Sequence, residues 1–221
     1  MIAIFIYDKI IRMNKNKLII IGAGGYAKSV LDSIDYNTYE LVGFIDERLE
    51  SNEHLGYKVL AHNLEDISDK EDFYYFIAIG DNVKRKKWFD RLKENNLRII
   101  NIIDKTSIVS PRATIGEGCF IGKMAIVNSC AVIGDNAVIN TKSLVEHGCT
   151  VKNHANISTN TTINGDVIVG EGTVLYSGVT VIGQRSVGNW SIVGAGAVVT
   201  KNIPDNIVAV GIPAKIIKEN K

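Results

Sequence analysis

The chain contains 221 residues, of which 46% are hydrophobic and 22% are charged, a composition ordinary for a globular protein of one large or two small domains. Its 25 lysine and arginine residues nearly balance its 24 aspartate and glutamate residues. This balance argues against nucleic acid or an anionic membrane as a partner, because neither sign of charge dominates. We expect the partners to be small molecules or further copies of the chain.

Two features indicate a cytoplasmic protein without membrane insertion. Residues 1–16 hold a short apolar stretch broken by Asp8 and Lys9, too short to span a bilayer, and we treat them as an N-terminal extension. The three cysteines are an odd number without metal-ligand spacing, so they do not indicate a secreted disulfide framework.

Residues 17–104 are predicted to form a small parallel α/β domain. Its first strand leads into a glycine turn and a helical pattern in GAGGYAKSVLDSI. A later helix, VKRKKWFDRLKEN, is expected to pack through Trp88, Phe89 and Leu92 and to expose residues 84–87 to solvent. Strands are expected at 17–22, 40–47, 73–80 and 97–103.

The glycine turn fits the G-x-G-x-x-A dinucleotide fingerprint over Gly22–Ala27, and Asp46 follows about twenty residues later, where a ribose hydroxyl is held in such folds. An NAD enzyme is disfavoured, because the second mononucleotide half and a separate domain for hydride chemistry are both missing. The N-terminus of the following helix can equally hold a carboxylate or the phosphate of a nucleotide sugar.

The second half of the chain is a repeat of six. From Val109 to Val199 every sixth residue is Val, Ile or Leu, and the residue four places later is nearly always small. A helix repeats every 3.6 residues and a strand every two, so neither explains this period. Short strands joined by turns, three hexads per coil, predict a triangular solenoid over residues 105–221 in which residues 18 apart stack.

The same pattern assigns the turns and the cysteines. The residue directly after each aliphatic is often Gly or Asn, residue types that tolerate positive φ or tight turns, so we expect a turn in each hexad. Cys119 and Cys149 fall on the small interior row and are expected to be buried and inert, whereas Cys130 lies off that row.

The segments GEGCFIG, VGEGTVL and IVGAGAVVTKNIPDNIVAVGIPAK resemble the hexapeptide-repeat acyltransferases, whose β-helix is left-handed. Together with the small domain, stretches such as LIIIGAGGYAKSVLDSI, VINTKSLVEHG and NISTN resemble the NeuD/PglD sugar acyltransferases, and sialic acid O-acetyltransferases of the NeuD type in particular. The resemblance implies a Rossmann-like domain that binds a sugar or nucleotide, followed by a left-handed parallel β-helix. It also implies acetyl-CoA as the acetyl donor and a homotrimer with active sites between subunits.

The resemblance gives His147 the role of general base, which histidine fills well near neutral pH. Glu146 is a possible partner of this base, although consecutive residues at a turn are expected to point apart. Gly165 follows one coil later, so it is expected to stack beside His147 and leave room for pantetheine. The resemblance implies that its backbone amide lies near the acyl group.

Two positions depart from the N-acetyltransferases of the family. Those enzymes carry an acidic residue where this chain has Gly148, and a second histidine where it has Asn156. Asn156 can still donate a hydrogen bond to the acetyl carbonyl. His154 lies two residues earlier and is not assumed to substitute.

Further binding residues follow from the resemblance. For acetyl-CoA it implies the backbone of Ala195, with Lys201 and Lys215 near the phosphates. Lys142 is our own addition, as a cation that can attract a sialate carboxylate. The positions carried over for the sugar site are Gly24, Gly25, Tyr26, Asp46, Glu47 and Gly80.

These features favour acetyl-CoA-dependent O-acetylation of sialic acid or CMP-sialic acid. Two alternatives remain: N-acetylation of a UDP-linked 4-amino sugar, and a non-catalytic regulator of sialic acid synthesis. A γ-class carbonic anhydrase shares the solenoid but needs three histidines converging on zinc, and the repeat region holds two, His147 and His154. No metal is therefore expected.

Overall fold

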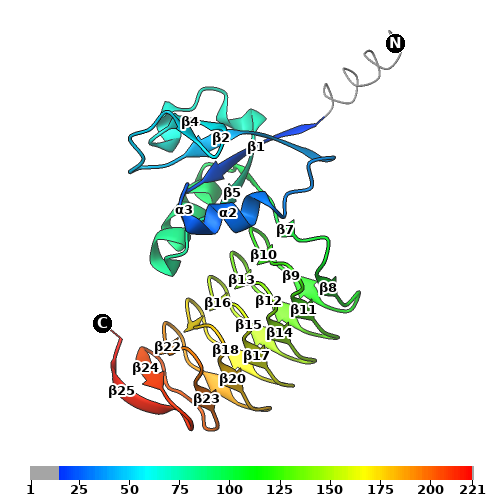
Figure 1. Cartoon of the computed structure of the whole chain (residues 1–221), viewed down its shortest axis with the longest axis vertical. Helices are drawn as coiled ribbons and strands as arrows, with labels where there is room; N and C mark the ends of the chain where they lie inside the picture. The colour runs from blue at the N-terminus through cyan, green and yellow to red at the C-terminus, as the bar shows by residue number, and fades with distance from the viewer. Residues whose placement is uncertain (1–14, 221) are drawn as a thin grey trace.

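The computed structural model describes residues 15–220, and residues 1–14 of the expected extension lie outside the described residues. The chain forms an α/β domain that sits on one end of a long β-helix, as Figure 1 shows from blue to red. The predicted fold class, an N-terminal Rossmann-like domain followed by a left-handed parallel β-helix, is confirmed.

The small domain is built on a six-stranded sheet of order β3-β4-β2-β1-β5-β6, parallel except for β3. Alternate residues of the central strand face opposite layers: Leu18 and Ile20 pack in the cluster that includes α2, whereas Ile19 and Ile21 pack in the cluster that includes α3. The strands are β1 (Asn16–Ile21), β2 (Tyr39–Ile45), β3 (Glu53–His54), β4 (Tyr57–Ala61), β5 (Tyr74–Ile77) and β6 (Arg98–Ile99). The helices are α2 (Gly25–Leu31), α3 (Asn82–Glu94) and the 3-10 turns η1 (Leu64–Asp66) and η2 (Lys70–Asp72).

Two features of this domain differ from the sequence prediction. The β3–β4 hairpin was not predicted, since its short strands in a polar segment carry no clear period. The single strand expected at 97–103 is two strands, because β6 ends the small sheet and β7 (Ile102–Ile103) pairs with β10. The hexad row thus extends one step back from Val109 to Ile103, so the β-helix begins directly after the small sheet.

The β-helix has three faces, and from β7 to β23 the strands of each face pair in parallel with residues 18 positions apart, as the repeat predicts. The end of face 1 departs from this step, because Ile192 of β22 pairs with Val208 of β24 and β25 is antiparallel to β24. Face 1 consists of β7, β10 (Phe120–Ile121), β13 (Val138–Ile139), β16 (Asn156–Ile157), β19 (Val174–Leu175), β22 (Ile192–Val193), β24 (Ile207–Val210) and β25 (Lys215–Glu219). Face 2 consists of β8 (Ile108–Val109), β11 (Ile126–Val127), β14 (Leu144–Val145), β17 (Thr162–Ile163), β20 (Thr180–Val181) and β23 (Val198–Val199). Face 3 consists of β9 (Thr114–Ile115), β12 (Val132–Ile133), β15 (Thr150–Val151), β18 (Ile168–Val169) and β21 (Ser186–Val187).

The aliphatic row fills the interior of the β-helix. Each member from Ile121 to Val199 is at most 1% exposed, and full burial of such a side chain contributes about 1.5–3 kcal/mol. Cys119 and Cys149 are buried, as predicted, and Cys130, which lies off the interior row, is exposed. Burial raises the pKa of the Cys119 thiol to about 12, so this thiol is inert at neutral pH.

Each hexad contains the predicted turn, but positive φ does not fall on the residue directly after the aliphatic. The left-handed residue stands three places after the interior aliphatic, and it recurs every six residues, for example at Gly148, His154 and Asp166. The glycines directly after the aliphatic serve close stacking instead: a Cβ on Gly122 would lie 2.8 Å from the backbone nitrogen of Thr141 in the next coil.

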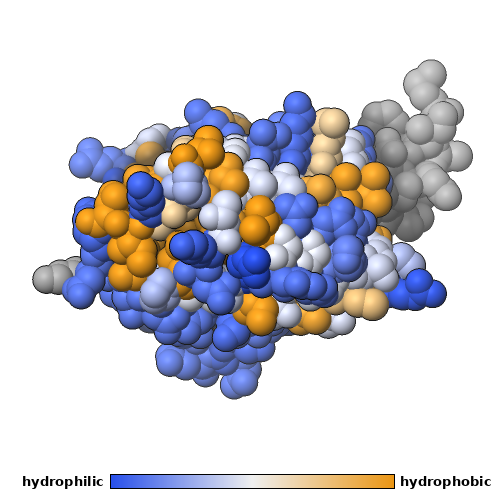
Figure 2. Space-filling model, turned by 90° about the horizontal axis from the view of Figure 1, so that it is seen from below, coloured by the Kyte–Doolittle hydropathy of each residue, from blue (hydrophilic) through white to orange (hydrophobic). Residues whose placement is uncertain are grey.

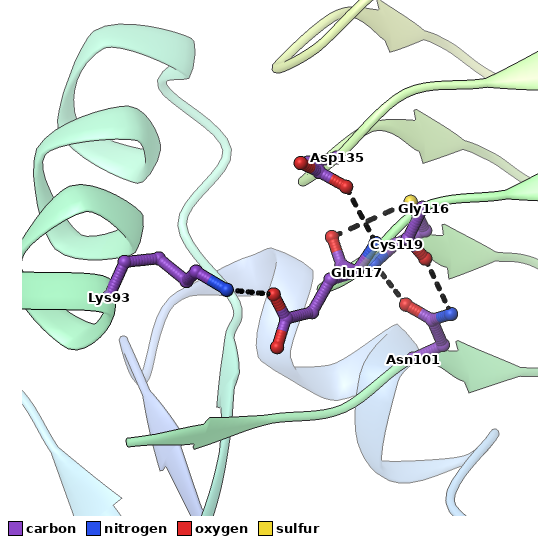
Figure 3. A network of polar contacts seen from close by, with 6 residues as sticks. All are labelled: Lys93, Asn101, Gly116, Glu117, Cys119 and Asp135. Atoms are coloured by element: carbon purple, nitrogen blue, oxygen red, sulfur yellow. Dashed lines mark hydrogen bonds and ion pairs between the residues drawn. The ribbon is translucent and has the colours of Figure 1, made fainter. Parts of the chain in front are cut away.

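The two domains share an extensive interface. Phe120 and Val138, on the outer side of face 1, belong to the same apolar cluster as the core around α2. Polar contacts lie beside it: the Lys93 ammonium on α3 pairs with Glu117 at 2.6 Å, and Asn101 bridges the backbone of the first coil, as Figure 3 shows. The small domain is therefore held on the β-helix at several points.

Asp104 is a buried carboxylate at the start of the β-helix, 3% exposed, and it ties α2 to the first coil. Its oxygens accept hydrogen bonds from the hydroxyls of Ser33 and Thr106, both at 2.6 Å, and from the Thr106 N–H. Burial raises the pKa of Asp104, but the hydrogen bonds from Ser33 and Thr106 outweigh burial, and the pKa lies below its ordinary value.

The Asp104→Asn protein is expected to lose about 2 kcal/mol of unfolding free energy at pH 7, because a hydrogen-bonded charge is removed. A carboxyl with a depressed folded-state pKa stabilises the fold above its unfolded pKa, about 3.9, and this contribution disappears as pH falls through the folded value. Urea titrations at pH 7 and about pH 3 should therefore show the difference between wild type and variant shrinking at the lower pH. Asp35→Asn is the matched control, since Asp35 accepts similar bonds from Asn37 and Thr38 at the surface. An equal loss in both variants would contradict the role given to Asp104.

Figure 2 views the molecule from the C-terminal end of the β-helix and shows apolar side chains lying among polar ones. In the C-terminal hairpin β24–β25, the apolar residues Val210, Ile212, Ile216 and Ile217 are exposed. Among the helices within residues 15–220, none is long and apolar enough to cross a membrane.

Candidate active site

A cavity of about 350 Å³ opens at the carboxyl ends of the small-domain strands. In open α/β sheets, ligands bind at this edge. The cavity is lined by loops after β1, β2 and β5 and by Lys84 and Trp88 of α3. All of the residues predicted for sugar binding in this domain line it, namely Gly24, Gly25, Tyr26, Asp46, Glu47 and Gly80.

The carboxylate of Asp46 accepts several hydrogen bonds from backbone N–H groups. One oxygen accepts from the Ala23 N–H at 2.7 Å, and the other accepts from the N–H groups of Arg48 and Leu49 at 2.9 and 3.0 Å. A carboxylate offers about four acceptor sites, so three are occupied without a ligand. Asp46 thus holds the glycine turn against the loop after β2, and Glu47 beside it is the exposed carboxylate of this wall.

Tyr26 connects the cavity to the β-helix. Its ring packs edge-on against Phe120 of β10, with ring centroids 5.4 Å apart, and its hydroxyl oxygen is buried without a hydrogen-bond partner. Burial raises the pKa of Tyr26 above its ordinary value, so the hydroxyl stays protonated.

His147 lies at the edge where the chain passes from face 2 to face 3, and its side chain is 66% exposed. Its Nδ1 lies 3.1 Å from a carboxylate oxygen of Glu146, which also accepts the His147 N–H at 3.1 Å. The expectation that these neighbours point apart was therefore wrong. The hydrogen bond from the His147 N–H is the leading cause that lowers the pKa of Glu146, so the carboxylate is ionised near neutral pH.

Gly165 stacks under the imidazole as the repeat predicts. A Cβ on Gly165 would lie 2.6 Å from His147 Nε2 and 2.7 Å from Cε1, so the ring occupies the space that a side chain would need. Gly148 is equally constrained: its φ is +66°, and a Cβ there would overlap the carboxylate of Asp166 in the next coil. An acidic side chain therefore does reach the position beside Gly148, but from the neighbouring coil.

His147 begins a row of equivalent turn positions along one edge of the β-helix. The paired interior residues Val145, Ile163, Val181 and Val199 place His147, Gly165, Gly183 and Lys201 above one another. Three coils separate His147 from Lys201, a span of about 14 Å at the usual strand spacing. Two glycines, which carry no side chains, thus stand between the histidine and the lysine along this edge.

The other residues predicted for the site lie elsewhere on the single chain. Asn156 is the first residue of β16 on face 1. Lys142 and Ala195 lie on the edge between faces 1 and 2, and Lys215 begins β25. Within one chain, the structure does not bring these four residues together with His147.

Comparison with known proteins finds similarity over both domains of the chain. Residues 17–92 match the family model described as the PglD N-terminal domain. A variant of perosamine N-acetyltransferase from Caulobacter crescentus, solved with CoA and GDP-perosamine, is 32% identical with a TM-score of 0.88, covering 92% of this chain and 98% of that one. The acetyltransferase domain of PglB from Neisseria gonorrhoeae, solved with acetyl coenzyme A, is 30% identical with a TM-score of 0.87, covering 92% of this chain and 100% of that one.

The chain belongs to the PglD-type sugar acetyltransferases. WeeI from Acinetobacter baumannii shares the fold, with a TM-score of 0.74 at 24% identity over 92% of this chain and 100% of that one. An uncharacterized protein of Acanthamoeba polyphaga mimivirus is 31% identical over 103 residues, and the match covers 47% of this chain and 20% of that protein. The chain thus spans about a fifth of the length of this curated relative.

In this PglD-type chain the second histidine of the β-helix is structural. His154 is 4% exposed, packs edge-on against Phe89 of α3, and its Nδ1 accepts from the Asn136 amide at 2.9 Å. Burial lowers the pKa of His154, so its ring is neutral. His154 therefore belongs to the domain interface and not to the His147 row.

Sequence reasoning missed Arg85, which was assigned to the solvated face of α3 and is 1% exposed. The signal was present, because Arg85 precedes Trp88, Phe89 and Leu92 by three, four and seven positions and so shares their helical stripe. Within residues 15–220, no group of three or more His, Cys, Asp or Glu side chains is placed to hold a metal ion.

Proposed function

We propose that this chain transfers an acetyl group from acetyl-CoA to a sugar that is bound through its nucleotide in the small-domain cavity. The observation that carries the proposal is the arrangement of His147, with Nδ1 on the Glu146 carboxylate and Nε2 over Gly165. With Nδ1–H donated to an ionised carboxylate, Nε2 presents its lone pair as a base.

In the proposed reaction, Nε2 of His147 removes a proton from the acceptor amine or hydroxyl as that group attacks the thioester carbonyl. The N–H group of Gly165 is the proposed donor to the oxyanion of the tetrahedral intermediate. Collapse of the intermediate breaks the C–S bond, and the proton on His147 passes to the departing thiolate of CoA. Glu146 stabilises the imidazolium that exists between the two proton transfers.

The row from His147 to Lys201 is the proposed track for acetyl-CoA. CoA is an extended molecule, and the glycines at 165 and 183 leave room for its narrow arm while Lys201 offers a cation to a phosphate. Asn156, Ala195, Lys142 and Lys215 lie away from this row, so their proposed roles require a second subunit. We infer a homotrimer with sites between subunits, and a fully active monomer in light scattering would contradict it.

The favoured acceptor is the amino group of a nucleotide-linked amino sugar, because the similar perosamine enzyme was solved with GDP-perosamine. The second candidate is a hydroxyl of sialic acid or CMP-sialic acid. It is favoured by Gly148 and Asn156, which replace the acidic residue and the second histidine of the N-acetyltransferases that the sequence resembles.

An acceptor panel with labelled acetyl-CoA tests the proposal. Purified protein is offered GDP- and UDP-linked amino sugars, CMP-sialic acid and free sialic acid, and the labelled product is split by alkaline hydrolysis, which cleaves an ester faster than an amide. Label on an amine supports the first candidate and label on a hydroxyl supports the second. If no acceptor is labelled, the transfer proposal is wrong and a regulatory role becomes the better hypothesis.

Replacing Glu146 by glutamine is expected to lower kcat about tenfold with little change in KM for either substrate. A hydrogen bond to a charged group contributes about 1.5–3 kcal/mol, and the exposure of His147 puts this pair at the lower end. Steady-state kinetics of Glu146→Gln beside Glu171→Gln, another carboxylate on the β-helix, measure the effect. Equal rates in the two variants would remove Glu146 from the mechanism.

A further inference from the structure

Arg85 joins the small-domain cavity to the β-helix. On the cavity side its Nη1 donates to the carbonyl oxygens of Ile79 and Gly80 at 3.2 and 3.3 Å. Gly80 lines the cavity, and both carbonyls follow β5 directly. The guanidinium therefore holds the loop that forms one wall of the proposed sugar site.

The same guanidinium holds two turns of the β-helix. Its Nε donates to the Asn136 carbonyl at 3.2 Å and its Nη2 to the His154 carbonyl at 2.8 Å. These residues are 18 apart, so they occupy the same edge in successive coils. Asn82 extends the contact by one more coil, since its amide donates to the Gly172 carbonyl at 3.0 Å while its oxygen accepts from Arg85.

The charge of Arg85 is balanced by these carbonyl and amide oxygens, and no carboxylate of the described residues is hydrogen-bonded to the guanidinium. A planar guanidinium spreads five N–H donors over three nitrogens, so it can bond the separated carbonyls of both domains at once, whereas a lysine ammonium has three donors on a single nitrogen. A buried guanidinium in this arrangement fixes the relative positions of the groups around it, because each N–H donor must point at its own acceptor to keep its hydrogen bond.

We propose that Arg85 is a positioning residue that sets the place of the sugar cavity relative to the coil carrying His147. The β-helix is one continuous hydrogen-bonded ladder, so fixing the cavity on the turns at 136 and 154 fixes it relative to every coil. His147 and His154 lie at successive edges of one coil. The inference rests on the proposed function, in which the acceptor in the cavity must meet His147.

Arg85→Lys is the main test, because lysine keeps the charge and can serve the carbonyls of one domain but not of both. We expect kcat to fall about 10- to 100-fold, since a displacement near 1 Å costs about 10²-fold in rate. The Kd for the nucleotide sugar should change little, because the walls of the cavity belong to the small domain. Lys93→Met is the matched control: it breaks another α3 contact with the β-helix but touches neither the cavity nor the two turns.

A distance measurement makes the test independent of activity. In a Cys130→Ser background, spin labels at Lys58→Cys and Arg112→Cys, diluted with unlabelled protein, report the separation of the two domains. The distribution of distances between the two spin labels should broaden or shift in Arg85→Lys and stay unchanged in Lys93→Met. If Arg85→Lys does not fold, Asn82→Ala replaces it, because that change removes one acceptor of Arg85 and one contact with the β-helix.

Each outcome decides the proposal. A changed distribution with a lowered kcat at a temperature where the variant is folded supports positioning. An unchanged distribution overturns it, and so does a changed distribution with unchanged kcat, which would leave Arg85 a purely structural role. If wild-type protein acetylates no acceptor, the proposed function fails, and the distances still show whether Arg85 sets the place of the cavity.

Discussion

The His147→Ala protein is expected to lose acetyl transfer by about 10²- to 10⁴-fold in kcat, the usual contribution of a positioned general base. The ring has no role in the fold: it is 66% exposed, and its one side-chain partner is the neighbouring Glu146. The thermal unfolding midpoint and the Kd for CoA should therefore stay close to the wild-type values. Single-turnover transfer at saturating acetyl-CoA measures the chemical step without product release.

Two controls separate loss of the base from loss of the site. Removing the imidazole leaves open space over Gly165, so imidazole added to the buffer should restore part of the rate. The Glu171→Gln protein, altered at the edge between faces 3 and 1 and not at the edge that carries His147, should transfer at the wild-type rate. An unchanged kcat in His147→Ala would exclude His147 as the base.

Most of the architecture follows from the repeat, because a period of six fits a triangular solenoid of short strands and fits neither a helix nor an ordinary strand. Interior positions must be aliphatic or small, so the burial of Val145 and Cys149 can be predicted from their places in the repeat. The turn register was harder to predict. Glycine has two properties, tolerance of positive φ and the lack of a Cβ, and in this solenoid the glycines directly after the aliphatic use the second. The φ-positive position accepts His154 and Trp190, so composition does not mark it.

The parts of the site that depend on the 18-residue step of the β-helix could be predicted from the sequence. The parts that depend on contacts between the small domain and the β-helix could not. The step of 18 residues places Gly165 under His147 without any further information. Arg85 depends on carbonyls at 136 and 154, which are far along the chain and carry no side-chain signal. The Glu146 contact depends on a rotamer at one turn, which a sequence pattern does not encode.

Gly165→Ala is expected to lower kcat about 10²-fold while the fold is kept. Gly165 does not lie in the left-handed region, so alanine fits the backbone, but its Cβ would stand 2.6 Å from His147 Nε2. The imidazole must then swing away from the acyl group, and a misplacement of about 1 Å is enough for a loss of this size. Gly183→Ala is the matched control, because it changes the same turn position one coil later. A Cβ there would approach the Gly165 carbonyl oxygen at 3.2 Å and no atom of His147 within 4 Å.

A double-mutant cycle shows whether Gly165 acts through the ring. If the added methyl harms transfer by displacing the imidazole, Gly165→Ala should have little further effect in the His147→Ala background, since the ring is already absent. If the methyl instead blocks the arm of CoA, the two losses should multiply and KM for acetyl-CoA should rise in both Gly165→Ala and Gly183→Ala. The first result ties the glycine to the base, and the second ties it to the track that runs from His147 to Lys201.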